Sequence, residues 1–141
     1  MSKAPKKSPA SSLRIGVDPS IARTIWILGT TTARSAALVE ALETAGHNPH
    51  VAEQGNELNP SLKDHRPDLI IIDMQEARER GRHVGGQLRA DRSTRQVPII
   101  LVGLGDGEEA VKFEKAVTGP TRRYVLGLDA PSVIGSIVAE L

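Results

Sequence analysis

Short runs of apolar residues recur along the chain, separated by longer segments of mixed polarity. Clear runs lie at 24–28, 69–72, 98–102 and 123–126, and a weaker one lies at 49–52. Such short runs, rich in β-branched residues and bounded by Gly, Pro or Asp, are typical of parallel strands buried on both faces. The pattern therefore predicts five strands.

The segments between these runs have helical patterns. An apolar stripe over 37–45 ends at Gly46, a residue that favours a helix C-terminus. Asn59 and Pro60 are typical of a helix start, because the first can cap the helix and the second fits its first turn. The five predicted helices cover 37–45, about 60–63, 80–90, 108–116 and 131–141.

Strands that alternate strictly with helices predict a single α/β domain. Right-handed crossovers then give a parallel sheet covered by helices on both faces. We expect this domain to span 22–141. Residues 1–21 form a basic arm that is rich in Ser, Pro, Lys and Ala at its start, and we expect it to be disordered.

Charge and composition exclude several classes of function. The first 17 residues hold four basic side chains and no acid, whereas the remainder holds 14 basic and 17 acidic residues. A weakly acidic domain does not favour direct nucleic-acid binding. The chain has no cysteine, its four histidines lack metal-ligand spacing, and no apolar run is long enough to span a bilayer. The start does not have the pattern of a secretory signal, so we expect a cytoplasmic protein without membrane insertion.

Two stretches resemble the receiver domains of two-component response regulators. They are "PDLIIID" at 67–73 and "GGQLRADRSTRQVPIILV" at 85–102, and Gly81 also lies where receivers usually have glycine. The resemblance covers about 22–141. It implies a flavodoxin-like, doubly wound, five-stranded parallel sheet of order 2-1-3-4-5 with five flanking helices, in agreement with the alternation above.

The resemblance also implies a phosphorylation site that this chain retains only in part. Receivers accept a phosphoryl group from a histidine kinase on an aspartate that ends the third strand, and Asp73 matches this phosphoacceptor. Two acids after the first strand normally help to hold Mg²⁺, but the matching residues are Gly29 and Thr30. Since Mg²⁺ requires several oxygen ligands, we expect its binding to be lost or weak, with no other cofactor.

The fourth and fifth strands have lost their matching side chains too. A Thr or Ser that normally contacts the phosphoryl oxygen is replaced by Gly103, and the lysine that normally pairs with the phosphate is replaced by Gly127. Tyr124 keeps the aromatic switch position, which in receivers connects the site with the face of the fourth helix, fifth strand and fifth helix.

We interpret the chain as a non-enzymatic pseudo-receiver that works by contact with a signalling protein, through the face around Tyr124 or the helix at 80–90. A homodimer is an open option. One alternative is a working phosphorelay receiver phosphorylated at Asp73. Another is a small anion- or nucleotide-binding module that uses the glycine turns "GTTT" at 29–32 and "GLGDG" at 103–107.

Overall fold

Five parallel strands form one sheet in a computed structural model that describes residues 22–52, 66–75, 78–117 and 119–141. The strands are β1 (Thr24–Leu28), β2 (Asn48–Ala52), β3 (Leu69–Asp73), β4 (Ile99–Val102) and β5 (Thr121–Tyr124). Their order is β2-β1-β3-β4-β5, and every neighbouring pair is parallel. The predicted fold class and strand order are therefore confirmed.

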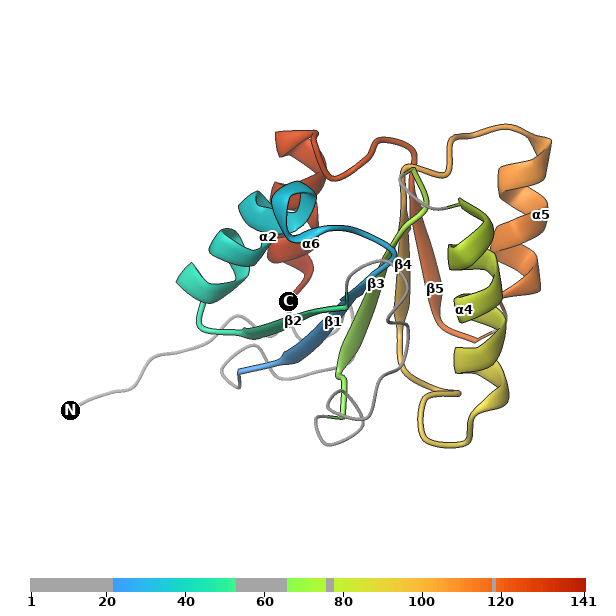
Figure 1. Cartoon of the computed structure of the whole chain (residues 1–141), viewed down its shortest axis with the longest axis horizontal. Coiled ribbons are helices and arrows are strands. Elements are labelled where there is room, and N and C mark those ends of the chain that lie inside the picture. The colour runs from blue at the N-terminus through green and yellow to red at the C-terminus, as the bar shows by residue number, and fades with distance from the viewer. Residues whose placement is uncertain (1–21, 53–65, 76–77, 118) are drawn as a thin grey trace.

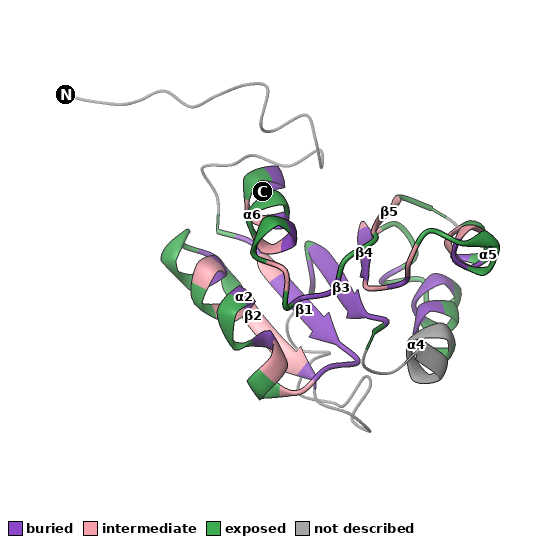
Figure 2. Ribbon diagram, turned by 90° about the horizontal axis from the view of Figure 1, so that it is seen from above, coloured by how far each residue is buried: buried purple, intermediate pink, exposed green. Residues whose placement is uncertain are grey.

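Helices cover both faces of this sheet (Figures 1 and 2). One face is covered by α2 (Thr32–Thr44) and α6 (Pro131–Glu140), and the other by α4 (Arg78–Ala90) and α5 (Glu108–Ala116). The described residues thus hold four helices rather than the predicted five, and the helix predicted near 60–63 lies outside them.

Alternating strand residues build the two halves of the core. In β1, Ile25 and Ile27 pack toward α2 and α6, whereas Trp26 and Leu28 pack toward α4 and α5. All four are at most 3% exposed. Because successive side chains of a strand point to opposite faces, an apolar run without alternation requires cover on both sides. This requirement explains why the apolar runs in the sequence predicted a sheet covered by helices on both faces.

The fifth strand ends earlier than its apolar run predicts. β5 covers Thr121–Tyr124 rather than 123–126, so Val125 and Leu126 leave the sheet and are about half exposed. Its partner β4 ends at Val102, and Gly103 then turns the chain with a φ of 76°. The backbone N–H of Gly103 donates to the carbonyl oxygens of both Tyr124 and Leu126, so regular pairing of β5 with β4 ends at this turn.

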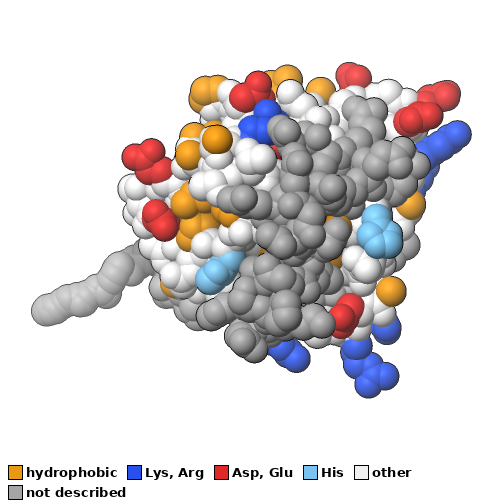
Figure 3. Space-filling model, viewed as in Figure 1, with side chains coloured by type: hydrophobic (Ala, Val, Ile, Leu, Met, Phe, Trp, Pro, Cys, Tyr) orange, Lys and Arg blue, Asp and Glu red, His pale blue; other side chains and the backbone are white. Residues whose placement is uncertain are grey.

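The surface in Figure 3 carries mixed charges. Within the described part of this face, Lys and Arg side chains are interspersed with Asp and Glu rather than gathered into one basic field. None of the described helices is long and apolar enough to cross a lipid bilayer.

Two adjacent glycines lie inside α4, and they give a first prediction. A Cβ atom on Gly85 would lie 3.4 Å from Val117 Cγ2, whereas one on Gly86 would meet nothing within 4 Å. Because glycine weakens a helix by about 1 kcal/mol relative to alanine, Gly86→Ala should raise the free energy of unfolding by about that amount in urea denaturation. Gly85→Ala is the matched control, with a smaller gain. A loss of stability in Gly86→Ala would contradict helical structure at this position.

Candidate functional site

The carboxyl ends of the strands bring the predicted site residues to one edge of the sheet. Gly29 follows β1 and lies close to β3. A Cβ atom on Gly29 would be 3.3 Å from the Asp73 carbonyl oxygen. Thr30 is fully buried beside it, and Gly103 and Gly127 follow β4 and β5. Tyr124 ends β5 and aligns with Val102, which in turn aligns with Asp73, and its side chain packs toward α6.

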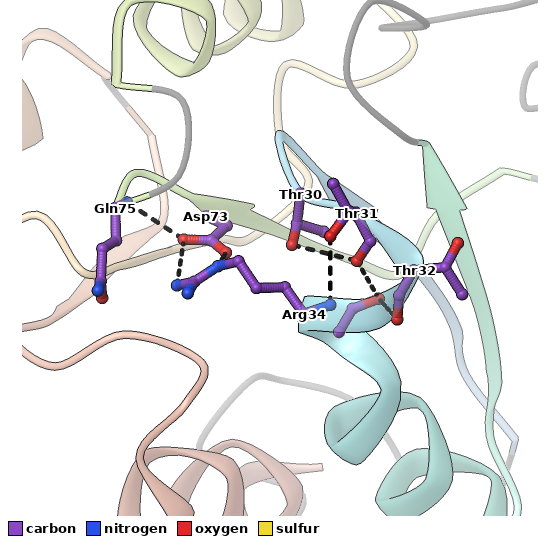
Figure 4. A network of polar contacts seen from close by, with 7 residues as sticks. Thr30, Thr31, Thr32, Arg34, Asp73 and Gln75 are labelled. Carbon is purple, nitrogen blue, oxygen red and sulfur yellow. Dashed lines mark hydrogen bonds and ion pairs between the residues drawn. The ribbon is translucent and has the colours of Figure 1, made fainter.

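Asp73 forms a two-point ion pair with Arg34 (Figure 4). Arg34 Nε lies 2.7 Å from Asp73 Oδ2, and a terminal guanidinium nitrogen lies 3.3 Å from Oδ1. The Asp73 side chain is fully buried, whereas that of Arg34 is 21% exposed. Two parallel, charge-assisted hydrogen bonds are the strongest arrangement that these two side chains can form. Arg34 therefore neutralises the carboxylate inside the protein.

A main-chain group completes this arrangement. The backbone N–H of Gln75 donates to Asp73 Oδ1 at 3.1 Å. Both carboxylate oxygens of Asp73 thus accept hydrogen bonds from the protein itself. A carboxylate held in this way has its charge compensated within the protein.

The start of α2 explains how Arg34 comes to face Asp73. Thr31 is the N-cap, and its side-chain oxygen accepts from the backbone N–H of Arg34 at 3.2 Å. This bond fixes Arg34 in the first helical turn, at the same sheet edge as Asp73. Sequence reasoning missed Arg34, although a signal existed. A cation in the first turn opposes the helix dipole, so its presence indicates an acidic partner elsewhere.

Gln75 is the second residue that sequence reasoning missed. A Cβ atom on Gly103 would lie 2.6 Å from Gln75 Cβ, and one on Gly127 would overlap Gln75 Oε1. The two glycines therefore leave the space that the Gln75 side chain occupies. The signal was the pair of glycines at neighbouring strand ends, since a missing Cβ at both indicates a close approach by another group.

The residues at this edge do not fit a Mg²⁺ ion. Gly29 offers no side-chain ligand, and the Thr30 hydroxyl donates to the Thr31 carbonyl at 3.4 Å. The Asp73 oxygens already face the Arg34 guanidinium, which would repel a divalent cation. Among the described residues, no group of three or more His, Asp or Glu side chains could hold a metal ion. We therefore assign no metal chemistry to this site.

Known proteins with a similar fold identify the architecture. The chain resembles the signal receiver domain of a histidine kinase from Syntrophus aciditrophicus (23% identity, TM-score 0.64), over 83% of this chain and 87% of that one. It also resembles the chemotaxis response regulator CheY4 of Vibrio cholerae (16% identity, TM-score 0.67), over 86% of this chain and all of that one. The chain has the receiver fold.

Sequence comparison gives a weaker likeness. No family model matches the chain. It is 28% identical over 99 residues to the phosphate regulon transcriptional regulatory protein PhoB of Pseudomonas aeruginosa, which covers 70% of this chain. The aligned part is 43% of PhoB, so the chain spans less than half the length of this curated relative. A third protein with the receiver fold, the phosphorylated cyanobacterial phytochrome response regulator RcpA, is 19% identical over 84% of this chain and 90% of that one, with a TM-score of 0.63.

Proposed function

We propose that this chain is a receiver-like module of two-component signalling that works through protein contact, without phosphorylation of Asp73. The receiver fold and the likeness to PhoB support the signalling class. The observation that carries the proposal is the two-point ion pair between Arg34 and the buried Asp73.

This ion pair opposes phosphoryl transfer for two physical reasons. The Arg34 guanidinium and the backbone N–H of Gln75 stabilise the negative charge on both oxygens of Asp73, which makes the carboxylate a weaker nucleophile. Phosphoryl transfer also relies on positioned cations and usually Mg²⁺ to stabilise charge in the transition state. Here the Arg34 guanidinium neutralises Asp73 in the ground state.

The module would then signal by presenting a surface to a partner protein rather than by catalysis. The face that includes Tyr124 is our candidate for this surface. It lies on β5 and α6, and Val125 and Leu126, which directly follow Tyr124, are exposed. The competing function is a phosphorelay receiver, which the retained Asp73 at the end of β3 favours.

Treatment with a small-molecule phosphoryl donor distinguishes the contact module from the phosphorelay receiver. We expect acetyl phosphate with millimolar Mg²⁺ to leave the intact mass of the protein unchanged, because Arg34 and the Gln75 N–H already compensate the charge of Asp73. Beryllofluoride should likewise leave the fluorescence of the buried Trp26 unchanged. Asp73→Asn is the matched control for adducts elsewhere. A Mg²⁺-dependent phosphoryl adduct that disappears in Asp73→Asn would support the phosphorelay function instead.

A further inference from the structure

A second charged cluster ties the last helix to the edge strand. The Tyr124 hydroxyl donates to Glu140 Oε2, and the Arg122 guanidinium forms an ion pair with the same oxygen. Arg122 and Tyr124 are two residues apart in β5, so their side chains leave the same side of the strand. We call Arg122, Tyr124 and Glu140 the Glu140 cluster.

Burial of the Glu140 carboxylate makes its contacts with Arg122 and Tyr124 energetically important. Glu140 is only 5% exposed, and its Oε1 has no hydrogen-bond partner among the residues that the structure describes. A buried carboxylate is costly unless cations or hydrogen-bond donors compensate its charge. Since Tyr124 and Arg122 supply that compensation, moving either away from Glu140 is unfavourable. The Tyr124 ring also packs against the core on the α2 and α6 side.

The contacts of the Glu140 cluster are separate from those described for Asp73. Asp73 is held by Arg34 of α2 and by the backbone after β3, whereas Glu140 is held by side chains of β5. No residue takes part in both sets. The Tyr124 hydroxyl is therefore held from α6, whereas the Asp73 carboxylate is held from α2.

We propose that Glu140 is the positioning residue of the partner-binding face, holding Tyr124 and Arg122 in one arrangement that does not depend on Asp73. This inference rests on the proposed function in one respect, namely that the face around Tyr124 binds the partner. The Arg122 side chain remains half exposed, so the cluster presents a cationic group as well as part of an aromatic ring to a signalling protein.

Tyr124 reports directly on this cluster, because it is the only tyrosine in the chain. Burial raises the pKa of the Tyr124 hydroxyl above its ordinary value, and the hydrogen bond with Glu140 raises it further, while Arg122 acts in the opposite direction. Ultraviolet absorbance of the phenolate follows this ionisation. Glu140→Gln removes the negative charge, so the titration midpoint should shift downward, toward ordinary tyrosine.

Two variants provide matched controls for the titration. Glu114→Gln makes the same change of charge on α5, where the Glu114 carboxylate pairs with Arg123 of β5 at 3.0 Å. We expect it to leave the titration midpoint of Tyr124 unchanged. Asp73→Asn should also leave it unchanged. The NMR signals of the Tyr124 ring at neutral pH give a second measurement that avoids alkaline unfolding, and they should move in Glu140→Gln alone.

The outcomes are distinct. An unchanged midpoint and unchanged ring signals in Glu140→Gln would overturn the role of Glu140. A shift in Asp73→Asn as large as that in Glu140→Gln would overturn the independence from Asp73. Neither measurement uses a partner or a phosphoryl donor, so failure of the proposed function, seen as a phosphoryl adduct, is observed separately.

Discussion

Arg34→Ala should lower the free energy of unfolding by about 3 kcal/mol, the largest effect that we expect from a single surface-accessible side chain. The substitution leaves the Asp73 carboxylate fully buried without its counter-ion, and breaking a buried pair in this way costs about 3–5 kcal/mol. We choose the lower end because the Arg34 side chain is 21% exposed. Urea denaturation monitored by the fluorescence of Trp26 measures the change.

A double-mutant cycle tests whether the effect comes from the pair itself. Asp73→Asn should cost less than Arg34→Ala, because the partly exposed guanidinium can be solvated whereas the buried carboxylate cannot. In the Asp73→Asn background, Arg34→Ala should then be nearly neutral. Arg92→Ala, at an exposed arginine, is the control for loss of a surface cation. Equal costs of Arg34→Ala in both backgrounds would contradict the ion pair as the source of stability.

Gly103→Thr, which restores the residue type of ordinary receivers, should destabilise the fold by about 3 kcal/mol. Gly103 has a φ of 76°, and a β-branched residue is strained in this left-handed region. The new Cβ atom would also lie 2.6 Å from Gln75 Cβ. Thermal and urea unfolding of the variant measure the loss.

Gly127→Ala is the contrasting variant at the next strand end. The atoms that its Cβ would meet most closely lie at the far end of the flexible Gln75 side chain, so a rotamer change relieves the overlap and the cost should stay below about 1 kcal/mol. Gln75→Ala should remove that small cost but should not rescue Gly103→Thr, because alanine keeps the Cβ atom. Full rescue at 103 would show that backbone strain is not the dominant cost.

Sequence reasoning predicted the layered fold because burial on both faces leaves a direct trace in the chain. Ile25–Leu28 contains only apolar side chains, and such a segment is stable only between two layers. The same reasoning gave the end of β5 wrongly. Hydrophobicity favoured Val125 and Leu126 as strand residues, but β4 ends at Val102 and the chain turns at Gly103, so the regular ladder stops at Tyr124.

The sequence predicted which receiver side chains are missing from the site better than it predicted which side chains are present there. Comparison of strand ends identified Gly29, Thr30, Gly103 and Gly127 as positions without the expected side chains. It did not identify Arg34, whose partner Asp73 lies 39 residues away in the chain. A pairing over that distance depends on side-chain direction at a helix start, which a linear pattern does not encode.

The mutual fit of Gln75 with Gly103 and Gly127 also constrains how this sequence can change over evolutionary time. Thr at 103 meets the Cβ atom of residue 75 and an unfavourable backbone angle, and Lys at 127 meets the Gln75 amide. Replacing Gln75 alone introduces no new side chain at 103 or 127, because both glycines remain. A change toward Thr at 103 and Lys at 127 therefore requires several substitutions, and the first of them at 103 lowers stability. The stability lost in the first of these substitutions would oppose such a change in descendants of this chain, even if a kinase capable of modifying them were present.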